Sequence, residues 1–289
     1  MVNDLSPRPE QKRKKIVVKA GEEIMVFFGI LIALYVLVSI FAPWVAPYDP
    51  GDQNLGDRFL PPLTPGHVLG TDNLGRDLLS RLIFGGRISL SVGLFSIVMS
   101  GIVGTTLGLL AGYFGGILDD VINWLVNVQL AFPFVLLAIS VVIILGPSMT
   151  NIIILLVISG WPEFARLIRA KVLSLRSVGF VEAAVFTGVP EGRIIFRHIL
   201  PNTASSVLVL LTLGFAKMII AEAALSFLGL GPGGLRYSSW GLMLAEGKDY
   251  LAVAWWVATM PGLVIVTIVL SVNILGDWFR DKLDPKLRI

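Results

Sequence analysis

The stretch SVGFVEAAVFTGVPEGRIIFRHILPN, residues 177–202, is the longest polar interval between two hydrophobic segments of the chain. Ser177 can cap a first short helix, because its hydroxyl oxygen can accept a hydrogen bond from an unpaired backbone N–H of the first turn. Gly188 allows a bend, and Pro190 suits the first turn of a second helix, which Pro201 is expected to end. The stretch therefore predicts a small helix-turn-helix between two membrane spans. Such an element would suit the transmission of force to a partner outside the membrane.

The composition indicates a membrane protein. Of 289 residues, 55% are hydrophobic and 15% are charged, and the mean hydropathy is +0.82. A soluble domain typically has about 25% charged residues. The absence of cysteine excludes disulfides and cysteine metal sites. His67 and His198 are far apart and lack the spacing of metal ligands, so we interpret each as a local hydrogen-bonding residue and expect no metal site.

Six apolar stretches predict an all-α membrane protein with six transmembrane helices, since roughly 20 apolar residues cross the hydrocarbon core. They cover about residues 24–45, 88–110, 121–145, 152–161, 205–228 and 252–275. The third is expected to kink at Pro133. The fourth is short, so its helix is expected to begin near Ser148 and to continue past Pro162. The chain then divides into a polar tail, 1–23, and a transmembrane domain, 24–289.

The positive charges predict the orientation. The tail, the segment 162–203 and the C-terminal segment hold 16 Lys and Arg residues, whereas the segments 46–87 and 229–251 hold 6. Because cytoplasmic loops are enriched in Lys and Arg, both termini and 162–203 are expected to be cytoplasmic, and 46–87 and 229–251 external. A basic tail can also bind nucleic acid, but beside an apolar segment it is better interpreted as a cytoplasmic anchor, so no nucleic-acid partner is expected.

Two residue patterns predict, respectively, a close contact between helices and a helix on the external surface of the membrane. Gly104, Gly108 and Gly112 recur every four residues in the second span, which favours close approach of another helix. The segment 69–90 places acids four residues before bases, a spacing that supports a helix. The residues concerned are Asp72, Arg76, Asp77 and Arg81. We interpret them as shaping a helix on the membrane surface or receiving an external protein; the alternative is that they only solvate that surface.

The stretch 177–202 is similar to the EAA loop of ABC importer permeases, written E-A-A, three residues, G, nine residues, I-x-L-P. The matching positions are Glu182, Ala183, Ala184, Gly188, Leu200 and Pro201, and His198 stands where the pattern has Ile. Four sequence motifs resemble those of the dipeptide, oligopeptide and nickel branch of that family. They are RHILPN (197–202), GTDNLGRDLLSR (70–81), AEAALSFLGLG (221–231) and GDWFRDKLDPKL (276–287).

The resemblance implies a type I ABC importer permease fold and an assembly in the inner membrane of a bacterium or archaeon. The implied partners are a second permease, two cytoplasmic ATPases that bind ATP and Mg, an external substrate-binding protein and membrane lipid. The cargo would be peptides or a related small solute such as nickel complexes. The residues implied to couple to the ATPases are Glu182, Ala183, Ala184, Gly188, Arg193, Leu200 and Pro201.

Polar residues inside the spans are candidates for the translocation path, since charges within a membrane normally face water or a partner. They are Lys217, Glu222, Asn127 and Gln129. Lys217 and Glu222 are five residues apart, about 140° around a helix, and so are poorly placed to pair. Related permeases usually carry Arg and Asp where this chain has Trp124 and Asn127. The alternatives are an ion-coupled secondary transporter using Lys217 and Glu222, and a membrane scaffold or receptor without transport.

The segment GLMLAEGKD, Gly241–Asp249, briefly resembles a phosphate-binding loop. It has five residues between its glycines instead of four, and no hydroxyl residue follows its Lys. We therefore expect no nucleotide site, no catalytic residue and no cofactor in this chain, with ATP hydrolysed by other subunits.

Overall fold

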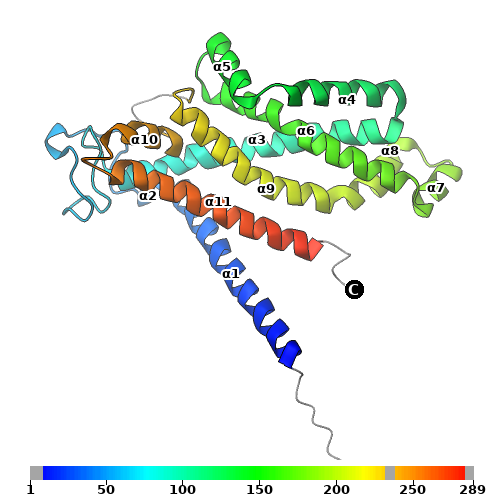
Figure 1. The fold of residues 1–289 in the computed structure, drawn as a ribbon, viewed down its shortest axis with the longest axis horizontal. Helices are drawn as coiled ribbons and strands as arrows, with labels where there is room; N and C mark the ends of the chain where they lie inside the picture. The colour runs from blue at the N-terminus through cyan, green and yellow to red at the C-terminus, as the bar shows by residue number, and fades with distance from the viewer. Residues whose placement is uncertain (1–8, 232–237, 284–289) are drawn as a thin grey trace, which may run out of the picture.

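The computed structural model of the chain describes residues 9–231 and 238–283, and these form helices without a β-strand. Long helices run along the long axis of the molecule (Figure 1): α3 (Leu78–Phe114), α6 (Met149–Arg176), α9 (Leu200–Phe227) and α11 (Trp256–Leu283). The N-terminal helix α1 (Pro9–Ile40) crosses α11 at an angle. The expectation of an all-α membrane protein is confirmed.

Among the described residues, five helices are long and apolar enough to cross a membrane. They are α1 over Glu23–Ile40, α3, α6, the continuous run Glu191–Phe227, and α11 over Trp256–Lys282. Two further helices, α4 (Gly116–Ala131) and α5 (Phe134–Leu145), meet at 89° and could together supply a sixth span. The chain is therefore a multi-pass membrane protein with five or six spans.

The bend between α4 and α5 is sharper than the expected kink at Pro133. Phe132 precedes the proline and has an extended backbone, with φ −84° and ψ 126°. The proline ring disfavours the helical region for the residue before it, so the helix stops at Ala131 and restarts at Phe134. The predicted single span 121–145 is thus two separate helices.

Helix α3 packs against α6 more extensively than any other pair of helices in the described ranges. The three glycines at four-residue spacing lie in this contact, as expected. A Cβ on Gly104 would stand 2.3 Å from the carbonyl oxygen of Trp161, and one on Gly108 would stand 2.6 Å from that of Ala165. These positions therefore need glycine because the two helix backbones almost touch.

One predicted boundary is wrong: helix α3 begins at Leu78 rather than near residue 88. Helix α1 begins at Pro9, and its apolar part, Glu23–Ile40, agrees with the predicted start of the first span near residue 24. Helix α6 does begin after Ser148, whose hydroxyl accepts from the Asn151 N–H at 3.1 Å, and it continues past Pro162 to Arg176. Ser177 follows the end of α6 and does not cap the next helix, whose preceding residue, Val178, provides no side-chain cap.

The segment 229–251, predicted as a turn-rich loop, contains the helix α10 (Trp240–Gly247) between α9 and α11. Its two glycines are packing positions. A Cβ on Gly241 would lie 2.5 Å from the Cα of Ala223, and one on Gly247 would lie 2.6 Å from the backbone N of Ala258. The two glycines that resemble those of a phosphate loop are therefore needed for close contacts between helices.

The remaining short elements lie at the two ends of the molecule. Helix α2 (Ala42–Val45) and 3₁₀ turns at Leu55–Asp57 and Lys248–Tyr250 lie at one end, and α7 (Gly179–Phe186) and α8 (Glu191–Ile194) lie at the other (Figure 1). A π turn, Ile195–Ile199, joins α8 to α9. The described start of α1 and the end of α11 point toward the α7 end (Figure 1).

Replacing Gly104 with alanine is expected to destabilise the folded chain by about 1–3 kcal/mol, as overpacking of a close contact does. The added methyl group would meet the backbone of α6, which cannot move aside as a flexible side chain could. Gly29→Ala is the matched control, since its Cβ would lie at an ordinary 3.7 Å from Leu275. Thermal denaturation of the purified protein should show a lower midpoint for Gly104→Ala alone; equal midpoints would contradict the close-contact account.

Candidate functional site

The EAA-like residues form a helix, a turn and a second helix at one end of the molecule (Figure 1). Helix α7 ends in a left-handed turn at Gly188, whose φ is +74°. The Gly188 N–H donates to Val185 O at 3.0 Å, and the Val189 N–H donates to Ala184 O at 3.1 Å. This is the pattern that closes a helix through a residue with positive φ, so the expected role of Gly188 as the bend is supported by its geometry.

The two faces of α7 differ sharply. Val181 and Ala184 are buried in a cluster with Ile168 and Val172 of α6. The opposite face is exposed and includes Glu182, Ala183 and Val185, and Phe186 is 87% exposed. Large exposed apolar side chains such as Phe186 are typical of a surface that another protein or lipid covers. The helix is therefore anchored by one face and presents the other.

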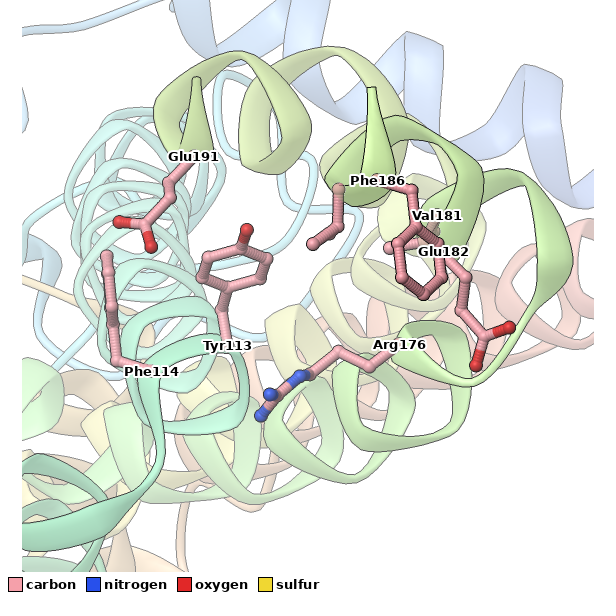
Figure 2. A pocket seen from close by; sticks show the side chains of 8 residues that line it. Tyr113, Phe114, Arg176, Val181, Glu182, Phe186 and Glu191 are labelled. Carbon is pink, nitrogen blue, oxygen red and sulfur yellow. The ribbon is translucent and has the colours of Figure 1, made fainter. Parts of the chain in front are cut away.

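A pocket of about 480 Å³ lies beneath this tip, where the ends of α3 and α6 meet α7 and α8. Figure 2 shows Arg176 and Glu191 on either side of Tyr113, whereas the Glu182 carboxylate points away from that ring. The Arg176 guanidinium lies 5.8 Å from the centre of the Tyr113 ring. The pocket thus combines aromatic walls with charges of both signs, from the Arg176 guanidinium and the Glu191 carboxylate, a chemistry suited to a polar side chain of a partner.

The expectation that Pro201 ends the second helix is wrong. The π turn Ile195–Ile199 leads directly into α9, in which Pro201 lies in the first turn. A proline lacks the N–H that a helix interior needs, and a wider turn just before it accommodates the missing bond. Consequently the tip is continuous with a membrane-spanning helix, and Arg193 is exposed at its start.

Lys217 and Glu222 do not pair with each other. Lys217 donates to both carboxylate oxygens of Glu163 at 3.0 Å. Glu222 is 1% exposed and accepts hydrogen bonds from Ser89 at 3.0 Å and Ser226 at 2.7 Å. It therefore joins α9 to α3 inside the bundle. Glu163 was not singled out in the sequence, because its separation from Lys217 by 54 residues gives no pattern to detect.

The other polar residues of the spans lie on α4. Asn127 is exposed, and its side-chain oxygen accepts from Arg166 at 3.4 Å. Gln129 is partly exposed near the end of α4, and Trp124 is exposed. The start of α4 is held more firmly: Asp119 accepts two hydrogen bonds of 2.5 Å from Arg169 of α6. This bidentate contact links two helices and was also missed in the sequence.

The charges of the segment before α3 are buried rather than solvated. Asp72, Arg76 and Arg81 are at most 2% exposed, and the two arginines both donate to Glu246 of α10, at 3.0 and 2.7 Å. Asp72 accepts from Arg76 Nε at 2.6 Å and also pairs with Arg81. The network therefore joins the segment before α3 to the segment after α9.

The predicted helix over 69–77 is absent, and the physical reason is local. The Asp72 carboxylate accepts hydrogen bonds from the backbone N–H groups of Leu74, at 2.8 Å, and of Arg76, at 3.0 Å, and these bonds stabilise a turn. Asp77 caps α3 by accepting from the Ser80 N–H at 2.8 Å. It also bonds His67 at 2.9 Å, so that histidine is a local hydrogen-bonding residue as interpreted. The described residues contain no group of three or more potential metal ligands.

Comparisons with known proteins agree with this geometry. Residues 104–289 match the family model described as "Binding-protein-dependent transport system inner membrane component". Residues 24–62 match "N-terminal TM domain of oligopeptide transport permease C". Together the two matches cover most of the chain, including the tip and the first span.

Similar proteins are named as permeases. The chain is 44% identical over 259 residues to the dipeptide transport system permease protein DppC of Alkalihalophilus pseudofirmus, covering 90% of this chain and 84% of that protein. It is 45% identical over 260 residues to the di/tripeptide permease protein DppC of Pseudomonas aeruginosa, covering 88% and 86%. It is 41% identical over 267 residues to the glutathione permease protein GsiD of Pectobacterium atrosepticum, covering 92% and 88%.

The fold is also found in solved structures. An inward-facing MetNI methionine ABC transporter chain aligns with a TM-score of 0.57 at 19% identity, covering 71% of this chain and 96% of that chain. A chain of an amino acid ABC transporter aligns with a TM-score of 0.53 at 17% identity, covering 71% and 93%. These similarities confirm the ABC importer permease fold.

Replacing Asp72 with asparagine is expected to destabilise the α10 end of the molecule by about 3–5 kcal/mol, because it leaves two buried arginines short of a counter-charge. Asp52→Asn is the control, since Asp52 is exposed in the same segment. Limited proteolysis of the membrane-inserted protein should cleave the Asp72→Asn variant faster within residues 46–77. Cleavage at the rate of the control would show that the network does not hold this segment.

Proposed function

The chain belongs to the family of binding-protein-dependent transport system inner membrane components, and on that premise we propose that it imports peptides as one permease subunit of an ATP-driven transporter. The proposal rests above all on the exposed tip formed by α7, Gly188 and α8. The relatives support the cargo class, since their names specify dipeptides, di/tripeptides and glutathione. Nickel complexes are a related solute that the same branch of permeases would accommodate.

We assign the tip to the ATPase subunits. Its exposed face offers Glu182, Ala183 and the apolar side chain of Phe186, while Val181 and Ala184 anchor it to the bundle. The small residues permit close approach of a partner, and the rim carboxylate of Glu191 adds a negative charge beside the pocket. Movement of an ATPase would then push α8 and, through the π turn, the continuous helix α9.

The remaining partners follow from the two ends of the molecule. In this proposal the α7 end and both termini are cytoplasmic, as the distribution of Lys and Arg predicts. The opposite end, with residues 46–77 and α10, receives the external binding protein in a bacterial or archaeal inner membrane. A second permease completes the pathway, and ATP and Mg bind to the ATPases, so this chain is not itself an enzyme.

The docking role of the external charges becomes indirect. Asp72, Arg76, Asp77 and Arg81 are buried, so they would support the docking surface by fixing its shape rather than by touching the binding protein. The path residues Lys217, Asn127 and Gln129 retain their proposed role at exposed or partly exposed positions. Glu222 is no longer proposed to line the path. Its carboxylate is enclosed by serines, so its proposed role is to join the helices of the bundle.

Reconstitution tests this function directly. The chain with its second permease and ATPases, placed in proteoliposomes, should accumulate a dipeptide only when ATP and loaded binding protein are both supplied. An ion-coupled carrier would instead accumulate substrate from an ion gradient without ATP. In the structure Lys217 contacts Glu163 and Glu222 contacts serines, so this alternative would need two separate coupling groups.

Replacing Gly188 with valine is expected to reduce ATP-driven uptake strongly while leaving membrane insertion normal. The Cβ would enter open space, so the cost is the positive φ alone, roughly 1–2 kcal/mol. Gly146→Val is the matched control, because that glycine also has a positive φ, +80°, and open space around it, but lies between α5 and α6, outside the tip. Co-purification of the ATPases and their stimulation by loaded binding protein should fall only for Gly188→Val. Equal behaviour of the two variants would remove the turn from the mechanism.

Replacing Glu182 with lysine is expected to weaken ATPase co-purification by about tenfold or more. The side chain is exposed on the presented face of α7, so the reversed charge would not disturb the packing of the bundle. Asp52→Lys provides the same change in net charge on an exposed side chain of the external segment. If both variants retained the ATPases equally, Glu182 would lie outside the contact.

A further inference from the structure

The ion pair between Lys217 and Glu163 joins two helices of membrane-spanning length, and both of its side chains are exposed. Glu163 is near the middle of α6, and Lys217 is in the apolar part of α9. The Lys217 side chain is 64% exposed and the Glu163 side chain is 50% exposed, so this pair is more exposed than the other Lys and Arg ion pairs described above. A charge in this region normally faces water or a partner, because exposure to lipid is costly.

A second ion pair that involves α6, between Arg169 and Asp119, has the features expected of a pair that stabilises the structure. Arg169 and Asp119 make two hydrogen bonds of 2.5 Å, and their side chains are 31% and 15% exposed. Removing either partner would leave a charge inside a helix contact. The Lys217–Glu163 pair has no such enclosure, and an exposed ion pair contributes little to stability. Lys217 can therefore exchange Glu163 for another anion at little cost.

The surroundings of the pair favour an anion. Arg166 follows Glu163 by about one helical turn and is exposed on α6, where its guanidinium makes a long 3.4 Å contact with the Asn127 oxygen. Lys217, Glu163 and the exposed Arg166 one turn along α6 together carry two positive charges and one negative charge. Their net positive charge complements a carboxylate, and a guanidinium can bind a carboxylate through two parallel hydrogen bonds.

We propose that Lys217 and Arg166 form a site in the translocation path that binds the carboxylate of a passing peptide. In the empty transporter Glu163 holds the Lys217 ammonium, and the substrate carboxylate replaces it. This inference rests on the proposed function, because the carboxylate is that of the imported peptide. It adds a substrate contact within the membrane to the recognition made by the external binding protein.

The two halves of the pair should respond in opposite ways. In the reconstituted complete transporter at saturating loaded binding protein, Lys217→Gln is expected to lower peptide uptake per ATP hydrolysed by about tenfold. Lys217→Arg retains the cation and should keep most of the uptake. Glu163→Gln removes the competing anion, so its uptake should equal or exceed that of the wild type. A pair with only a structural role, or a contact with the second permease, predicts equal loss from Lys217→Gln and Glu163→Gln.

A labelling experiment tests the ligand itself. The chain has no cysteine, and Ile220, one turn beyond Lys217, is 49% exposed. In the purified complete transporter, a cysteine introduced by Ile220→Cys should react with a charged thiol reagent. Millimolar glycylglycine should slow the reaction severalfold, whereas glycylglycinamide, which lacks the carboxylate, should not. The protection should disappear when Lys217→Gln is added.

The outcomes separate this inference from the proposed function. If the wild-type transporter shows no ATP-dependent peptide uptake, the proposed function fails, and the site fails with it. If the wild type transports normally but Lys217→Gln and Glu163→Gln reduce uptake equally, only the carboxylate site is overturned. Equal protection of the introduced cysteine by the two glycine compounds, or no protection by either, also overturns the site alone.

Discussion

The close contact between α3 and α6 is the constraint on which the rest of the structure depends. Helices in a bilayer gain little from hydrophobic burial, because lipid is as apolar as a leucine side chain, so they associate through close packing. Gly104 and Gly108 let the backbone of α3 approach the carbonyl groups of α6. This contact fixes the position of α6. Helix α6 in turn carries the apolar cluster that anchors α7, the ion pair between Arg169 and Asp119 of α4, and the ion pair between Glu163 and Lys217 of α9.

The tip is therefore placed by rigid elements and not by a flexible linker. Val181 and Ala184 are held by Ile168 and Val172 of α6. On the other side, α8 runs through the π turn into α9 without a break in the helix. A displacement of the tip must move two membrane helices together, since one packs beneath it and the other continues from it. This geometry suits the conversion of movement outside the membrane into rearrangement within it.

Charge is used differently at different depths of the molecule. At the α10 end of the molecule, Asp72, Arg76 and Arg81 are enclosed with Glu246 and join two segments distant in sequence. In the bundle, Glu222 is enclosed by hydroxyl groups. At the same time the Lys217–Glu163 pair is exposed, in the apolar region where an exposed charge is least favourable. Burial thus separates the charges that hold the structure from those that can meet a ligand.

The sequence by itself determined the features that depend on local patterns. Hydropathy predicts helices of membrane-spanning length, four-residue spacing predicts the α3–α6 contact, and the E-A-A pattern locates the tip and its glycine turn. Only the tertiary structure decided which distant groups meet. Glu163 joins Lys217, Arg169 joins Asp119, and the charges of 72–81 enclose themselves with α10 instead of forming a surface helix. Periodicity reports which face of a helix is apolar, whereas side-chain partners depend on how helices far apart in sequence cross.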